Sequence, residues 1–103
     1  MRVINENEFE PLVKDSKGVV VLDFFATWCG PCKMLSPILE QVEQENIANI
    51  YKVDVDDSFD LAKSFGIMSV PTLLFFKDGE LKDKQIGLRQ KHQIIETINL
   101  LKN

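Results

Sequence analysis

The two cysteines of the chain, Cys29 and Cys32, lie three residues apart in the run Trp28-Cys29-Gly30-Pro31-Cys32. Thiols at this spacing can bind a metal, form a structural disulfide, or cycle between dithiol and disulfide. A structural zinc site needs four ligands, and the single histidine, His92, is far along the chain, so only a dimer sharing a site would suffice. A disulfide ring of about four residues adds only roughly 2 kcal/mol of loop-closure stabilisation. We therefore favour a redox-active pair and expect no metal.

The residues around the pair predict different roles for the two sulfurs. The apolar run 19–26 predicts a buried strand, and a helical pattern begins near Pro31. If Cys29 caps that helix, its side chain can accept the N–H of Cys32, because Pro31 has none. This bond and the helix dipole favour a thiolate at Cys29, which makes it the attacking sulfur. We expect Cys32 to be less exposed and to resolve the mixed disulfide, while Gly30 lets a partner backbone come close.

Strands and helices alternate along the chain that must position this pair. Strands are predicted at 2–5, 19–26, 50–55, 72–76 and 81–86. The first helix is predicted to begin after Asn5 or Asn7 and to end at Gly18. Further helices are predicted at 31–46, 58–65 and 90–101. Strands that are apolar on both faces are typical of a sheet covered by helices on both sides. The alternation predicts parallel strands joined by right-handed crossovers, and Asp78-Gly79 predicts a hairpin that makes the last pair antiparallel. The result is an α/β fold with a mixed sheet.

Two prolines fall inside the predicted helices. We expect Pro11 near the first turn of its helix, where the missing N–H does least harm. Pro37 lies deeper in the second helix, where it removes one backbone bond and predicts a kink.

Length and composition indicate one domain, residues 1–103, with 45% hydrophobic and 27% charged residues. The net charge of −4 argues against nucleic acid and anionic membranes as partners. No stretch approaches the length of a membrane span, and the polar start does not resemble a secretory signal. We therefore expect a cytoplasmic protein, in which a close cysteine pair fits catalysis better than scaffolding.

Asp23 is the one charged residue in the strand that leads into the cysteine pair. A buried carboxylate is costly and holds its proton more tightly than an exposed one. Its position before the turn suggests that it lies beneath the pair, where it would act as general base toward Cys32, directly or through a water. The alternative is a carboxylate at a strand end that is exposed to water.

The run from Trp28 to Lys33, preceded by Asp23-Phe24 and followed by Pro37, resembles the thioredoxin family. The resemblance spans essentially the whole chain, since Val70-Pro71-Thr72 and Gly87 fall where that family has its cis-proline loop and late glycine. It implies a thioredoxin fold with a central five-stranded mixed sheet flanked by four helices. It also implies a monomeric protein-disulfide reductase that uses no cofactor beyond its cysteine pair. A flavin-containing, NADPH-dependent thioredoxin reductase would recharge it, and protein disulfides would be its substrates.

The resemblance also implies roles for residues around the pair. Val70 and cis-Pro71 would pair with an extended substrate, the alternative being a trans proline that merely starts a strand. Trp28, in the turn beside Cys29, would be exposed for partner contact, the alternative being a purely packing role. Lys52 would modulate Asp23, the alternative being a surface lysine. Gly87 would allow a close backbone approach near the site, the alternative being a plain turn glycine.

Some apolar and variable positions remain open to two interpretations. Met34 and Met68 could line a contact surface or pack, and we favour packing for Met34. Phe25 replaces the second tryptophan of many relatives, and Ser69 replaces a glycine, which could alter partner choice.

Three rival functions fit the same fold. An oxidase or isomerase typically carries a histidine between the cysteines, which Gly30-Pro31 disfavours. A binding module would use the fold and leave the thiols incidental. A glutathione-linked reductase would need a basic cleft, and no signature of one is visible.

Overall fold

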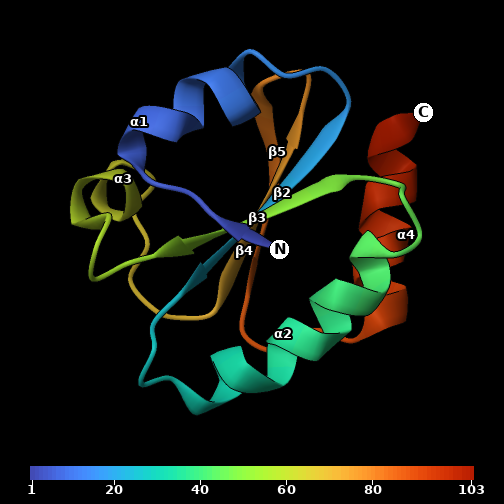
Figure 1. Ribbon diagram of the computed structural model, residues 1–103. Coiled ribbons are helices and arrows are strands. Elements are labelled where there is room, and N and C mark those ends of the chain that lie inside the picture. The colour runs from blue at the N-terminus through green and yellow to red at the C-terminus, as the bar shows by residue number, and fades with distance from the viewer.

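A five-stranded sheet in the order β1-β3-β2-β4-β5 crosses the middle of the molecule in the computed structural model, which describes residues 1–103 (Figure 1). The strands are β1 (Arg2–Val3), β2 (Val19–Phe25), β3 (Asn49–Asp54), β4 (Thr72–Lys77) and β5 (Glu80–Ile86). β3 runs parallel to β1 and to β2, whereas β4 is antiparallel to both β2 and β5. The predicted mixed sheet with a terminal hairpin is confirmed.

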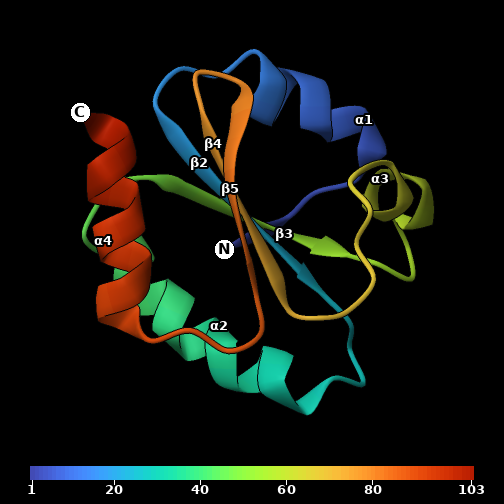
Figure 2. The same cartoon turned by 180° about the vertical axis from the view of Figure 1, so that it is seen from behind.

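Helices cover both faces of this sheet, as the doubly apolar strands predict. They are α1 (Glu6–Phe9), continued by the π-helical η1 (Glu10–Lys14), then α2 (Gly30–Glu43), α3 (Phe59–Ser64) and α4 (Lys91–Lys102). α1 and α3 lie on one face, and α2 and α4 lie on the other (Figures 1 and 2). None of the helices is long and apolar enough to cross a lipid bilayer.

The alternation of side chains along β2 builds a separate core on each face. Val20, Leu22 and Phe24 belong to the core beneath α1 and α3. Val19 and Val21 belong to the core beneath α2 and α4. Because successive side chains of a strand point to opposite faces, Asp23 lies on the same face as α2. The strand therefore delivers a carboxylate to the side of the sheet from which the cysteine helix starts.

Pro11 lies farther into its helix than the sequence predicts. The Asn5 side chain caps α1 and forms a reciprocal capping box with Glu8, so the helix begins well before the proline. Proline cannot donate to the carbonyl four residues back, and the helix widens at this point. The N–H of Asp15 instead donates to the carbonyl of Glu10, with an N–O distance of 2.8 Å. The expected first-turn position is wrong, and a π-helical turn absorbs the proline.

Candidate redox site

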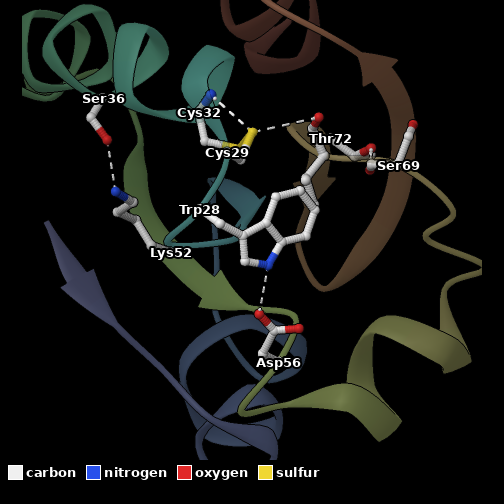
Figure 3. Close-up of a disulfide and its surroundings, with 9 residues drawn as sticks. Trp28, Cys29, Cys32, Ser36, Lys52, Asp56, Ser69 and Thr72 are labelled. Carbon is white, nitrogen blue, oxygen red and sulfur yellow. Dashed lines mark hydrogen bonds between the residues drawn. A yellow bond between two sulfur atoms is a disulfide. The ribbon is translucent and has the colours of Figure 1, made fainter.

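Cys29 caps α2 and is joined to Cys32 by a disulfide (Figure 3). The backbone of Cys29 is extended, and the N–H of Cys32 donates to its sulfur with an N–S distance of 3.2 Å. Pro31 occupies the first turn and presents no competing N–H. The cap geometry predicted from the spacing is confirmed. A helix N-terminus and one backbone donor therefore converge on the sulfur of Cys29.

Burial does not distinguish the two sulfurs in this oxidised state. Cys29 is 5% exposed and Cys32 is 3% exposed, so the lower exposure expected for Cys32 is barely seen. Their contacts differ more, because the Cys29 sulfur lies 3.8 Å from the carbonyl oxygen of Val70, across the site. The two cysteines therefore differ in what surrounds them, because the cis-proline loop lies next to Cys29.

Asp23 is fully buried, which rules out the alternative of a carboxylate at an exposed strand end. The strand register places it between Lys52 on β3 and Leu73 on β4. Neither carboxylate oxygen has a hydrogen-bond partner. Burial raises the pKa of Asp23 from 3.8 to about 6, although the charge of Lys52 opposes this shift. The side chain can thus gain and lose a proton near neutral pH.

Lys52 is half-buried, so it is not simply a surface lysine. Its ammonium donates to the hydroxyl of Ser36 on α2, with an N–O distance of 2.7 Å, and it points toward that residue in Figure 3. The same ammonium lies 4.4 Å from the centre of the Phe25 ring. Lys52 acts on Asp23 through space and forms no ion pair with it. The sequence prediction missed Ser36, although its position four residues after Cys32 places both on one helix face.

The peptide bond between Val70 and Pro71 is cis, and Pro71 is buried. The carbonyl of Pro71 accepts the N–H of Gly87, with an N–O distance of 2.8 Å, which ties the end of β5 to the loop. A Cβ on Gly87 would meet no atom of the chain within 4 Å, so the space beside this residue is open. Its backbone angle φ of +92° accounts for the glycine, because residues with a side chain rarely adopt that conformation. The approach of a partner backbone at Gly87 stays a prediction.

Trp28 lies beside the disulfide and is 71% exposed, as predicted. Its indole N–H donates to a carboxylate oxygen of Asp56, with an N–O distance of 3.0 Å (Figure 3). The sequence prediction did not anticipate this partner, because Asp56 lies just beyond the end of β3, far along the chain.

An apolar cavity of about 460 Å³ opens next to Trp28. Its lining includes Phe59, 63% exposed, and Met68, 96% exposed, which fits the contact-surface interpretation of Met68. Met34 is 60% exposed, so the packing expected for it is wrong. Met34 follows the buried Cys32 by two positions on α2, which turns it away from the core.

Residues that could bind a metal do not gather elsewhere in the molecule. No group of three or more His, Cys, Asp or Glu side chains is placed to hold an ion. The two sulfurs are bonded to each other.

Comparison with known proteins agrees with this geometry. The family model for thioredoxin matches residues 1–100. A thioredoxin of Listeria monocytogenes is 45% identical over 101 residues, which cover 96% of this chain and 96% of the relative. A thioredoxin of Bacillus subtilis is 41% identical over 101 residues, which cover 96% of this chain and 97% of the relative. A solved structure of a mutant thioredoxin from Halobacterium salinarum has a TM-score of 0.92 at 35% identity, covering 100% of this chain and 90% of that one. The chain therefore belongs to the thioredoxin family of thiol-disulfide oxidoreductases.

Proposed function

We propose that this protein reduces disulfides in other proteins, with Cys29 as the attacking sulfur and Cys32 as the resolving sulfur. The observation that carries the assignment is the cap of α2. The sulfur of Cys29 receives the backbone N–H of Cys32 at a helix N-terminus, where a thiolate is favoured. Cys32 lies in the first turn of the helix and is bonded to Cys29, so its sulfur is placed to attack Cys29 in a mixed disulfide.

The reaction would proceed in two exchanges. The thiolate of Cys29 attacks one sulfur of the substrate disulfide, whose second sulfur leaves as a thiolate and takes a proton from water. Cys32 then gives its proton to Asp23 and attacks the sulfur of Cys29. The bond between Cys29 and the substrate breaks, and the second substrate thiolate leaves. The substrate has gained two electrons, and the cysteine pair has lost two.

The residues beside the pair would position the substrate. We assign an extended segment of substrate to the backbone of Val70 before Pro71, because that carbonyl faces the attacking sulfur. The exposed ring of Trp28 would cover an apolar part of the same segment, and the end of β5 at Gly87 would flank it. Gly30 is exposed and a Cβ there would meet nothing, which leaves room for a partner backbone.

Members of the thioredoxin family work with a reductase and with disulfide substrates. For this chain we assign a flavin-containing thioredoxin reductase that draws electrons from NADPH. We also assign the protein to the cytoplasm, because a dithiol that must be kept reduced suits a reducing compartment. We further assign it as a monomer with a single domain over residues 1–103. Sedimentation of the reduced protein at the mass of one chain would support the monomer, and a mass of two chains would contradict it.

Single cysteine variants test the assignment of the two sulfurs. Cys32→Ser should accumulate a mixed disulfide between Cys29 and a protein substrate, visible as an added mass that dithiothreitol removes. Cys29→Ser should neither turn over nor trap substrate, because the helix cap that favours a thiolate and the carbonyl of Val70 both lie at the sulfur of residue 29. Turnover by Cys29→Ser, or trapping through Cys32, would contradict the proposed mechanism.

A further inference from the structure

The position of the Lys52 ammonium is unexpected for a cation beside a buried carboxylate. Lys52 and Asp23 are direct neighbours in the register of β3 and β2. Both oxygens of Asp23 are buried and lack a hydrogen-bond partner. An ammonium that could swing freely would be expected to pair with that carboxylate, since an unpaired buried charge is costly. It instead donates to the hydroxyl of Ser36, 2.7 Å away.

Two other groups that contact the Lys52 ammonium account for this choice. The hydroxyl of Ser36 supplies an acceptor from α2, and the face of the Phe25 ring attracts the cation at 4.4 Å from the ring centre. Ser36 and Phe25 together satisfy the ammonium without the carboxylate. Figure 3 shows the Lys52 side chain directed at Ser36 on the helix that carries both cysteines.

We propose that Ser36 is a positioning residue that holds the Lys52 ammonium away from Asp23 and so sets how readily that carboxyl accepts a proton. The inference rests on the proposed role of Asp23 as the base toward Cys32. A hydroxyl on α2 would thereby tune the step in which the substrate is released, although it touches neither sulfur nor substrate.

The other groups that face Asp23 leave Lys52 as the source of this control. β4 places Leu73 beside Asp23, and α4 contributes the apolar Ile94 and Ile98 to the core on the same face. On α2, Cys32 is bonded to Cys29 in the oxidised protein and does not titrate. Lys52 is the charged group that acts on Asp23, and its positive charge lowers the pKa of that carboxyl group.

The test is a titration of the Asp23 carboxyl in oxidised protein, where neither cysteine titrates. The protein is labelled with ¹³C at aspartate carboxyls, and Asp23→Asn identifies the signal by its loss. In Ser36→Ala the ammonium loses its acceptor and should turn to the carboxylate. The pKa of Asp23 should then fall by about one unit, the low end of the shift that an adjacent opposite charge causes in a carboxyl group. Alanine favours the helix, so the variant should fold.

Two further variants separate this effect from a general disturbance of α2. Ser36→Thr keeps the hydroxyl and should titrate as the wild type does. In a Lys52→Met background the substitution Ser36→Ala should produce no shift, because the cation through which it acts is gone. An unchanged midpoint in Ser36→Ala, or an equal shift without Lys52, would overturn the proposal.

The same variants keep this inference distinct from the proposed function. If Asp23→Asn reduces a protein disulfide as fast as the wild type, Asp23 is not the base, whatever its titration shows. If Asp23→Asn is slow but Ser36→Ala titrates normally, the base stands and the control by Ser36 fails. If Asp23 is the base and Ser36 controls its titration, the acid limb of the pH–rate profile of Ser36→Ala should shift to lower pH together with the pKa of Asp23.

Discussion

One side chain, Asp23, makes the stability of this protein depend on pH. Its pKa is raised from 3.8 to about 6 in the folded state, chiefly because burial disfavours the charged form. The folded protein therefore binds a proton more tightly than the unfolded chain. The stabilising contribution is fully present below about pH 4 and is lost as the pH rises through about 6. A difference of about two units between the folded and unfolded pKa values corresponds to about 3 kcal/mol in the free energy of unfolding.

We expect Asp23→Asn to become progressively more stable than the wild type as the pH rises. The difference in the free energy of unfolding between variant and wild type should grow by about 3 kcal/mol from pH 4 to pH 8. The measurement is urea unfolding of both oxidised proteins across that range. The informative quantity is how this difference in the free energy of unfolding changes with pH, because the cost of burying the asparagine amide is the same at every pH. A difference that stays constant with pH would contradict the raised pKa.

At the scale of elements, the β4–β5 hairpin is fastened to the end of the first helix. The backbone N–H of Gly18 donates to the side chain of Asp78, with an N–O distance of 2.8 Å. Gly79 has a φ of +83° and packs so closely that a Cβ would collide with the backbone carbonyl of Lys14 in η1. Asp78 and Gly79 therefore suit the contact with the first helix as well as the geometry of the hairpin turn.

Gly79→Ala should accordingly cost more than a glycine substitution that only strains the backbone. Gly66 is the matched control, since its φ is +65° and a Cβ there would meet nothing within 4 Å. Gly66→Ala should lower the free energy of unfolding by about 1 kcal/mol. Gly79→Ala should cost about 1–3 kcal/mol more, because the hairpin or η1 must shift. Denaturant unfolding of both variants measures this, and equal losses would show that the close contact is unimportant.

At the scale of the molecule, exposed apolar side chains gather beside the redox pair. Trp28, Phe59 and Met68 line one cavity, although α3 and the cysteine turn are far apart in the sequence. Leu100 is also exposed, but it lies on α4, on the opposite face of the sheet from α3 (Figure 1). Exposed apolar patches of this kind typically mark contact surfaces.

Phe59→Ala should therefore weaken reduction of protein substrates while leaving the chemistry intact. Loss of the ring should raise KM for a protein disulfide about fivefold, the effect of losing part of one buried aromatic contact. Turnover of a small aromatic disulfide should not change, because it does not reach α3. Leu100→Ala serves as the control and should alter neither substrate. Equal effects of the two variants would show that the cavity is not part of the contact surface.

The sequence by itself determined the features that depend on neighbours along the chain. The alternation of apolar strands and helices predicted the mixed sheet covered on both faces. The missing N–H of Pro31 predicted the hydrogen bond from Cys32 to the sulfur of Cys29, because a helix cap involves only a few consecutive residues. The apolar residues around Asp23 predicted its burial. Pro11 was placed wrongly, because the pattern did not decide between Asn5 and Asn7 as the cap of the helix.

Only the tertiary structure decided which side chains meet from different elements. The Ser36 hydroxyl reaches Lys52 because α2 packs over β3, and Asp56 reaches Trp28 because β3 ends beside the cysteine turn. Such contacts depend on strand register, helix placement and rotamers, which no local pattern of residues specifies. The spacing of two cysteines therefore predicted the chemistry, whereas the packing of distant elements decided where the cation beside Asp23 is held.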